Sequence, residues 1–482
     1  MAEADRLTIV AGISGVALMR RAASAVAAQA LRMHEGGRIA ILAGPGNNGG
    51  DAFGAAKMLR EQDIDVDIFT LGCIEELRGD ARTMADEWPG TTARLEDFKP
   101  GGYALIIDGL FGAGVSREIA GPARAAIERL NAVSAKVVAI DLPSGVSGAD
   151  GQVLGAAVRA DATVTFFARK PGHLLQPGRA LCGEIHVADI GIDHAVLYEI
   201  GPRIFANEPS LFKGTLLAGS QTHHKYDRGH AVVFSGGASQ TGAARLSAMA
   251  ALRGGAGLVT LFSPASALLV NAAHLTAVML RRCDGAGDLD EHLKDERLGT
   301  FVLGPGFGDL EKARDYASAI LRAGRRLVLD ADGITAFAGD PATLFALVTK
   351  DEPKLVLTPH DGEFARLFPD LADEASKLTR AREAAKRSGA IVVLKGSDTV
   401  IASHDGRAAI NGSGTPALAT AGTGDVLAGL VAAQLANGVP AFEAACAAVW
   451  LHAEAAKLFG IGLIAEDLPG LIPHALRRLA ER

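Results

Sequence analysis

The chain has 482 residues, a formal net charge of −7 and 49% hydrophobic residues. This length exceeds one ordinary hydrophobic core and predicts two to three domains. No apolar run reaches the ~18 residues that span a bilayer and no Lys/Arg-rich tract is present, so we expect neither a membrane nor a nucleic-acid partner. The four cysteines lack the spacing of a zinc site or a disulfide framework. No signal-peptide pattern precedes the first helix, and we expect a reducing, cytoplasmic location.

Residues 1–206 predict an α/β domain. Helical periodicity over residues 14–33, with Ser14 as N-cap, precedes an apolar run at 38–43 and a glycine-rich loop at 44–51, after which a helix resumes at Ala52. Further buried strands are expected at residues 66–71, 104–108, 137–141 and 162–167. Continuous apolar strands that alternate with helices are typical of a parallel sheet covered on both faces. We therefore expect a Rossmann-like, three-layer α/β/α sandwich.

Polar loops follow three of these strands. Residues 44–51 contain two asparagines and an aspartate, residues 108–117 combine glycines with the cation Arg117, and residues 141–145 begin with Asp141. The carboxyl ends of parallel strands meet at one edge of the sheet, where ligands bind, so we expect these loops to converge on a ligand. The alternative is that Asn48, Asp108 and Ser144 only brace their own loops, as loop polar groups often do.

These loops read Gly-Pro-Gly-Asn-Asn-Gly-Gly-Asp (44–51), Asp-Gly-Leu-Phe-Gly (108–112) and Ala-Ile-Asp-Leu-Pro-Ser-Gly (139–145). They resemble the signature of NAD(P)H-hydrate epimerases over about residues 8–200. The resemblance implies contacts to a hydrated nicotinamide dinucleotide from Asn47, Asn48, Gly49, Gly50, Asp51, Gly112, Ala113, Gly114, Val115, Ser116, Arg117, Glu118 and Asp141. It also implies a potassium ion held by Asn48, Asp108 and Ser144, whose oxygen atoms suit a hard cation. Asp141, which ends a strand opposite the glycine loop, is the candidate acid/base.

Residues 201–229 contain helix and strand breakers without strong periodicity, and we place the domain boundary after residue 206. Lys225, near the end of this stretch, is a candidate anion contact. A second α/β unit, residues 207–482, begins with a strand at 230–234. Its later strands end in small or polar residues at 304–308, 330–333, 358–363 and 395–399.

The turn Gly-Thr-Gly-Asp at residues 422–425 stands before an apolar helical pattern. Its glycines let backbone N–H groups approach an anion, and the N-terminus of the helix adds partial positive charge. Asp425 is placed to accept a proton from a substrate hydroxyl. The alternatives are that Asp425 only caps its helix and that His360 is a structural histidine.

In order along the chain, these segments resemble the ribokinase-like superfamily, and more narrowly the ADP-dependent NAD(P)H-hydrate dehydratases, over about residues 211–478. The resemblance implies a ribokinase-like α/β/α domain with hydrate contacts from Ala243, Gly306, His360 and Asp425. It implies adenosine-nucleotide contacts from Lys395, Gly396, Ser397, Asp398, Thr399 and Gly424. ADP is the implied co-substrate and Mg²⁺ the implied ion.

Together the resemblances predict a bifunctional enzyme of metabolite repair. The first domain would interconvert the (R) and (S) forms of NADH hydrate and NADPH hydrate. The second would dehydrate the (S) form at the expense of ADP, releasing AMP and phosphate, and we expect a homo-oligomer. The alternative is a ribokinase-like kinase for a vitamin precursor, joined to a non-catalytic nucleotide-binding domain.

Overall fold

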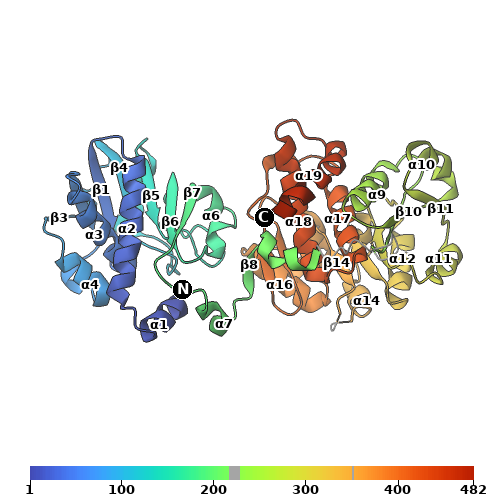
Figure 1. The fold of residues 1–482 in the computed structure, drawn as a ribbon, viewed down its shortest axis with the longest axis horizontal. Coiled ribbons are helices and arrows are strands. Elements are labelled where there is room, and N and C mark those ends of the chain that lie inside the picture. The colour runs from blue at the N-terminus through green and yellow to red at the C-terminus, as the bar shows by residue number, and fades with distance from the viewer. Residues whose placement is uncertain (217–227, 350–351, 482) are drawn as a thin grey trace. The chain divides into compact units, whose positions relative to one another are not determined.

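The computed structural model describes residues 1–216, 228–349 and 352–481, so that Lys225 lies outside the described residues. The chain divides into two compact units, Met1–Pro202 and Arg203–Arg482 (Figure 1). Strand β8 (Ile204–Ala206) pairs with a strand of the second unit, so this unit begins just before the boundary that we placed after residue 206. Within the described ranges, no helix is long and apolar enough to cross a lipid bilayer.

Within residues 1–202, all of which are described, seven strands form one sheet in the order β3-β2-β1-β4-β5-β6-β7, and every pairing is parallel. The strands are β1 (Arg38–Ala43), β2 (Val66–Thr70), β3 (Thr92–Arg94), β4 (Tyr103–Gly109), β5 (Lys136–Ile140), β6 (Ala162–Phe166) and β7 (Glu184–Ala188). The helices are α1 (Ala2–Val10), α2 (Gly15–Met33), α3 (Asn47–Arg60), α4 (Gly79–Asp86), α5 (Gly121–Asn131), α6 (Gly178–Leu181) and α7 (Val196–Ile200).

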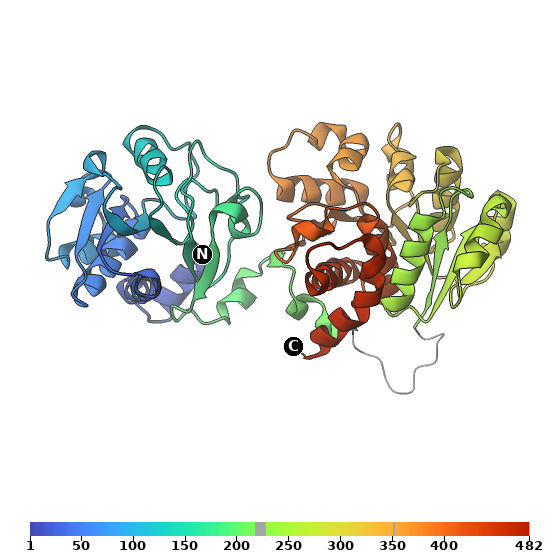
Figure 2. The ribbon, with the colours of Figure 1, turned by 90° about the horizontal axis from the view of Figure 1, so that it is seen from above.

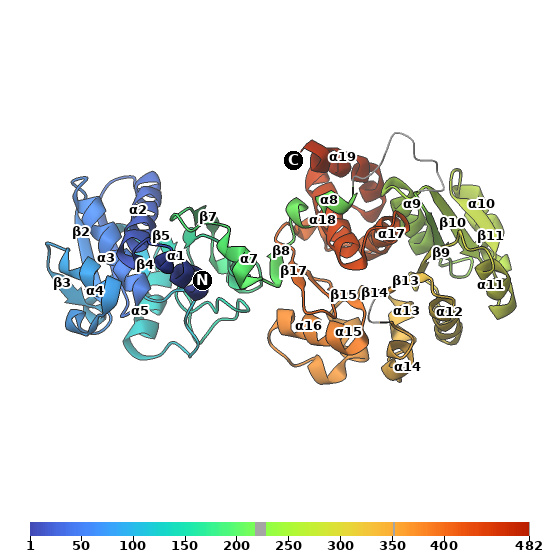
Figure 3. The ribbon, with the colours of Figure 1, turned by 60° about the horizontal axis from the view of Figure 1, so that its bottom comes forward.

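Alternate residues of the central strands enter two different cores. Ile39 and Ile41 of β1 pack with residues of α2, α3 and α4, whereas Ala40 and Leu42 pack with residues of α5. Successive strand residues point to opposite faces of a sheet, so helices cover both faces (Figure 3). The chain order reverses between β1 and β4, which places a crevice at their carboxyl ends. The predicted Rossmann-like sandwich is confirmed.

The segment after β1 differs from the prediction, because α3 begins at Asn47 and not at Ala52. Gly49 and Gly50 therefore lie in the first turn of the helix, where glycine is intrinsically unfavourable. Packing explains them, since a Cβ at Gly49 would collide with the carbonyl group of Gly44 and a Cβ at Gly50 would lie 2.6 Å from the Met19 sulfur. Close packing overrides the local preference that made this segment read as a loop.

Among the described residues of the second unit, ten strands form one sheet in the order β11-β10-β9-β12-β13-β14-β15-β16-β17-β8, in which only β16 runs antiparallel to its neighbours. Besides β8, the strands are β9 (His230–Phe234), β10 (Leu258–Ser263), β11 (Met279–Arg282), β12 (Thr300–Leu303), β13 (Arg326–Leu329), β14 (Leu355–Leu357), β15 (Ile391–Leu394), β16 (Val400–Ala402) and β17 (Ala408–Ile410). The helices are α8 (Lys213–Leu216), α9 (Gly242–Arg253), α10 (Leu268–His274), α11 (Ala286–Leu293), α12 (Leu310–Arg322), α13 (Asp332–Thr335), α14 (Pro341–Phe345), α15 (Asp361–Leu367), α16 (Lys377–Ser388), α17 (Thr423–Ala436), α18 (Ala441–Phe459) and α19 (Leu468–Glu481).

The second sheet is also covered on both faces. Val233 of β9 belongs to a core shared with α9, α17, α18 and α19, whereas the ring of the next residue, Phe234, lies 5.3 Å from that of Tyr316 in α12. Figures 2 and 3 show this division, with the C-terminal helices in red on one side of the strands and the orange helices α15 and α16 on the other. The second unit is thus a three-layer α/β/α domain.

The register of α17 against α9 generates a stability prediction. A Cβ at Gly429 of α17 would collide with the Ser247 carbonyl group of α9, so we expect Gly429→Ala to lower the free energy of unfolding by roughly 1–3 kcal/mol. In the matched variant Gly470→Ala, in α19, the new methyl group enters open space, and we expect a gain of up to about 1 kcal/mol. Urea unfolding of both variants measures the difference, and equal stabilities would contradict the proposed collision.

Candidate active sites

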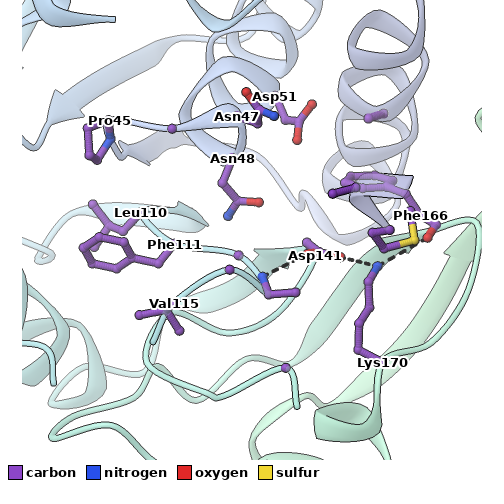
Figure 4. A pocket seen from close by; sticks show the side chains of 18 of the residues that line it. Pro45, Asn47, Asn48, Asp51, Leu110, Phe111, Val115, Asp141, Phe166 and Lys170 are labelled. Atoms are coloured by element: carbon purple, nitrogen blue, oxygen red, sulfur yellow. Dashed lines mark hydrogen bonds and ion pairs between the residues drawn. The ribbon is translucent and has the colours of Figure 1, made fainter. Parts of the chain in front are cut away.

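The first unit contains a cavity of about 1290 Å³ at the carboxyl ends of its central strands (Figure 4). The predicted residues that line it are Asn47, Asn48, Asp51, Gly112, Ala113, Gly114, Val115, Ser116, Arg117, Glu118 and Asp141. Helix α1 also contributes Met1, Ala2, Asp5 and Ile9 to the lining. Gly49 and Gly50 are absent from the lining and serve the packing of α3 described above. The three predicted loops thus converge on one cavity.

Asp141, directly after β5, is held by a network that fixes both of its carboxylate oxygens. Lys170 Nζ donates to Asp141 Oδ1 at 2.6 Å, the Thr165 hydroxyl donates to the same oxygen at 2.9 Å, and the Ala113 N–H donates to Oδ2 at 3.0 Å. The backbone of Asp141 has φ = 62°, an uncommon conformation for a residue with a side chain. Such strain persists only where the surroundings determine it, and it often marks a functional position.

The charges around Asp141 keep it ionised. Burial alone would raise the pKa of its carboxyl group, but the Lys170 ammonium and the hydrogen bonds lower the pKa below the ordinary value. His173 supports the same segment: its Nδ1 accepts the Lys170 N–H at 2.9 Å, so that Nε2 carries the proton donated to the Asp141 carbonyl oxygen at 2.7 Å. Burial lowers the pKa of His173 to about 4, which keeps the ring neutral.

We did not predict Lys170 or His173 from the sequence. Both follow β6, whose carboxyl end lies beside that of β5 in the sheet. The signal that could have identified Lys170 is its position in the loop after a buried strand, at the same edge of the sheet as the three polar loops from which we predicted the site. Lys170 is 9% exposed, and it lines the cavity.

Asp108 and Ser144, two of the predicted potassium ligands, are buried and do not line the cavity. The Ser144 hydroxyl donates to Asp108 Oδ1 at 2.6 Å, and the Ser144 N–H donates to Oδ2 at 2.7 Å. Burial raises the pKa of Asp108 to about 6, although these hydrogen bonds favour its ionised form. Asn48 Oδ1 and Asp141 Oδ2 both lie close to Gly112, where a Cβ would stand 2.8 Å from the first and 3.1 Å from the second. The amide oxygen of Asn48, the carboxylate of Asp108 and the hydroxyl of Ser144 are donors of the kind that fits a hard cation.

In the second unit, a buried ion pair joins the ends of two strands. Lys395, after β15, donates to Asp330 Oδ1 at 2.6 Å, and its Nζ lies 3.7 Å from Glu363 Oε2. The Thr358 hydroxyl donates to Asp330 at 2.9 Å. A Cβ at Gly424 would lie 3.4 Å from Lys395 Nζ, which places the ammonium against the Gly-Thr-Gly-Asp turn. Our predicted site set included Lys395 and Gly424 but omitted Asp330 and Glu363.

Asp425 stands in the first turn of α17 without acting as its cap. The N-cap is Gly422, at φ = 88°, and it makes no side-chain cap bond. The alternative in which Asp425 satisfies the first amides is therefore not what the structure shows. Burial first, and then the charges of Asp330 and Glu363, raise the pKa of Asp425 to about 6, while Lys395 opposes the rise. A carboxylate with this pKa is ionised at pH 7 and remains basic enough to accept a proton.

His360 is the N-cap of α15, as the structural alternative held. Its Nδ1 accepts the N–H groups of Gly362 at 3.0 Å and Glu363 at 3.2 Å, and Glu363 accepts the His360 N–H at 2.9 Å. The imidazole is 56% exposed, and its Nε2 lies 3.3 Å from Glu363 Oε1. Ala243 and Gly306 lie together, because a Cβ at Gly306 would stand 3.3 Å from the Ala243 methyl group.

Contacts from α16 fix the predicted nucleotide loop, which consists of Lys395, Gly396, Ser397, Asp398 and Thr399. Lys377 Nζ donates to Asp398 Oδ1 at 2.8 Å and to the Lys395 carbonyl oxygen at 3.1 Å. The Thr399 hydroxyl donates to the Gly396 carbonyl at 2.9 Å and accepts the Gly396 N–H at 3.2 Å. These contacts fix the loop beside Lys395 and the N-terminus of α17, where phosphate groups are favoured.

The two units define an α/β enzyme with a separate site in each domain. Comparison with known proteins gives its family. The family described as YjeF-related protein N-terminus matches residues 15–172, and the family described as NAD(P)H-hydrate dehydratase matches residues 231–472.

Relatives match both units together. A bifunctional NAD(P)H-hydrate repair enzyme from Thermofilum pendens is 35% identical and aligns over 92% of this chain and 88% of its own length. The enzyme of this name from Gloeobacter violaceus is 36% identical over 96% of this chain and 94% of its own length. The chain belongs to the family of bifunctional NAD(P)H-hydrate repair enzymes.

A crystal structure confirms the predicted fold of the second unit. A ribokinase-like superfamily protein from Enterococcus faecalis aligns with 58% of this chain and 97% of its own, with a TM-score of 0.51 and 24% identity. The second unit therefore has the fold of this ribokinase-like protein, the fold that the motifs at its strand ends predicted.

The ion pair in the first unit generates a prediction for Lys170→Met, which removes the charge but keeps the chain length. We expect the free energy of unfolding to fall by roughly 3–5 kcal/mol at pH 7, because Asp141 would remain as a buried, unpaired carboxylate. In the parent chain the pKa of Asp141 is lowered by folding, so the stabilisation by the pair is present above about pH 4 and is lost as the pH falls through the folded value. In the variant, burial without Lys170 raises that pKa, so the deficit should shrink between pH 7 and pH 5.

Urea unfolding at the two pH values measures this deficit. The double variant Asp141→Asn/Lys170→Met is the control, and it should recover part of the loss because no charge remains unpaired. An equal deficit at both pH values, with no recovery in the double variant, would contradict the role of the pair.

Proposed function

We propose that the chain repairs hydrated NADH and NADPH, with a separate reaction in each unit. The first unit interconverts the (R) and (S) hydrates, and the second dehydrates the (S) hydrate with ADP as co-substrate. The observation that carries this proposal is the convergence, in each unit, of the family's motif residues on one group of buried charges: Asp141 with Lys170, and Asp425 with Lys395 and Asp330.

In the second unit, Asp425 takes the proton of the ring hydroxyl as the hydroxyl oxygen attacks the terminal phosphoryl group of ADP. AMP leaves, and the phosphorylated hydrate then loses phosphate together with a proton from the neighbouring ring carbon, which restores the double bond of the dihydropyridine. Lys395 and the N-terminus of α17 stabilise the negative charge of the phosphates. Mg²⁺ bound to the phosphates of the nucleotide would neutralise their charge further.

In the first unit, Asp141 is the acid/base for the interconversion, and the lining of residues 47–51 and 112–118 holds the dinucleotide. A potassium ion held by Asn48, Asp108 and Ser144 would compensate the buried charge of Asp108 and fix the loops after β1, β4 and β5. The donor set supports this assignment, because each of the three side chains offers an oxygen and one of them is a buried carboxylate.

Asp425→Asn tests the dehydratase step. The amide keeps the shape of the side chain but cannot accept a proton, so we expect dehydration to slow by roughly 10²–10⁴ while epimerisation continues. In the parent chain, kcat/KM should fall as the pH drops below about 6, because protonation removes the base. The assay follows recovery of dihydronicotinamide absorbance from (S) hydrate and ADP.

Two outcomes would count against this assignment. Near-normal dehydration by the Asp425→Asn variant would remove Asp425 from the mechanism. Accumulation of a stable phosphorylated product in the parent reaction would favour the vitamin-precursor kinase.

Asp141→Asn tests the division of labour, and asparagine tolerates the positive φ at this position. With a racemic hydrate mixture and excess ADP, the parent chain should consume all substrate, whereas the variant should stop near one half, apart from slow spontaneous epimerisation. Its initial dehydration rate should be unchanged, because the second unit has its own core. A variant that consumes both isomers as fast as the parent would overturn the assignment, and a single-isomer assay would show whether the second site is stereospecific.

A further inference from the structure

A second carboxyl group lines the cavity of the first unit on the side away from Asp141. Asp51 belongs to the first turns of α3, and Figure 4 shows it on this helix while Asp141 and Lys170 lie across the cavity. The side chain is 7% exposed and contributes to the cavity lining. We propose that Asp51 is the proton donor of the epimerase site, acting on the ring hydroxyl from the wall opposite Asp141. This inference rests on the epimerase function proposed above.

The structure gives Asp51 no structural task. The N-cap of α3 is Gly46, which makes no side-chain cap bond, and Asp51 is the fifth residue of the helix, beyond the amides that need a cap. No hydrogen bond or ion pair to the Asp51 side chain is found among the described residues. Buried carboxyl groups are normally partnered, so a buried and unpartnered one that lines a cavity points to a ligand.

The charges that face Asp51 favour its neutral form. Burial raises its pKa well above the ordinary value, and the carboxylates of Asp141 and Asp5, the latter from α1, add to the rise. Lys170 makes no hydrogen bond to Asp51 that would lower this pKa, because its ammonium group donates to Asp141, Thr165 and the Phe166 carbonyl oxygen. Among the carboxyl groups that line the cavity, Asp51 is therefore kept neutral and Asp141 is kept ionised, the arrangement that separates an acid from a base.

The hydrate carries its hydroxyl on the ring carbon next to the ring nitrogen, and this placement defines the chemistry. Asp51 donates its proton to the hydroxyl oxygen, the C–O bond breaks with its electron pair remaining on oxygen, and water leaves. The nitrogen lone pair forms the C=N bond of an iminium ion. Water then adds to the other face of that carbon and gives its extra proton to Asp141. The overall step inverts the carbon and moves one proton from Asp51 to Asp141, and the reverse direction uses the same groups in exchanged roles.

The test compares Asp51→Asn with Glu61→Gln, a matched carboxyl-to-amide change at the exposed C-terminal end of α3. Each full-length variant is incubated with purified (R) hydrate, without ADP, in water enriched in ¹⁸O. The two isomers are then separated, and the ¹⁸O content of each is measured by mass spectrometry. We expect Asp51→Asn to slow interconversion by roughly 10²–10⁴ in kcat with a smaller change in KM, and Glu61→Gln to match the parent chain. The ring hydroxyl of the new isomer should carry ¹⁸O.

The pH profile adds a readout that a merely structural role would not move. In the parent chain, interconversion should decline as the pH rises through the raised pKa of Asp51, because the donor loses its proton. The residual activity of Asp51→Asn should lack this limb. Far-UV circular dichroism and urea unfolding of the variant should match the parent chain, which shows that the first unit is folded.

Contrary results would distinguish a failure of the role proposed for Asp51 from a failure of the epimerase function. Interconversion by Asp51→Asn within about threefold of the parent rate, or a product without ¹⁸O, would overturn the role of Asp51 while leaving the epimerase function in place. A parent chain that does not interconvert the isomers would overturn the epimerase function itself.

Discussion

A lysine–aspartate pair buried at the carboxyl edge of a parallel sheet organises each of the two sites. In the first unit Lys170 binds Asp141, and in the second Lys395 binds Asp330, each with an N–O distance of 2.6 Å. Removing two charges from water is costly, and the attraction between them offsets this cost only when further hydrogen bonds satisfy both groups. The additional contacts of Lys170 and the Thr358 hydroxyl bonded to Asp330 meet this requirement. The pairs therefore fix loops after different strands against each other, those after β5 and β6 in the first unit and those after β13 and β15, on either side of β14, in the second.

The pairs also set the protonation of the groups beside them. In the first unit, the ion pair lowers the pKa of Asp141, and the resulting negative charge helps to raise the pKa of Asp51. In the second unit, Asp330 and Glu363 raise the pKa of Asp425 to about 6, while Lys395 limits the rise. A group that must move a proton near neutral pH needs such tuning. One arrangement of charges would thus suit the proposed acid and base of the first site and the proposed base of the second.

Local sequence patterns were sufficient for most of the fold. The helix capped by Ser14, the strand at residues 38–43 and the strand at 230–234 occur where periodicity and turn residues placed them. The patterns are weaker for β3, which has only three residues, and for the partly exposed edge strand β7, and we predicted neither strand. The start of α3 was wrong because glycines that disfavour a helix locally are required by the packing against Gly44 and Met19. Lys170, Asp330 and Glu363 were missed as site residues because their function depends on partners distant in the chain.

The position of Asp425 shows why a motif alone does not define a site. No side-chain hydrogen bond to the Asp425 carboxyl group is found among the described residues, so the backbone of α17 must set its position. Two contacts with α9 fix that backbone: the Ser247 hydroxyl donates to the Asp425 carbonyl oxygen at 2.7 Å, and the Ser247 carbonyl group packs directly on Gly429, one turn further along the helix. An orienting hydrogen bond to the carboxyl group would have lowered its basicity. The small residues at the α9–α17 contact therefore hold the proposed base, Asp425, in place without lowering its basicity.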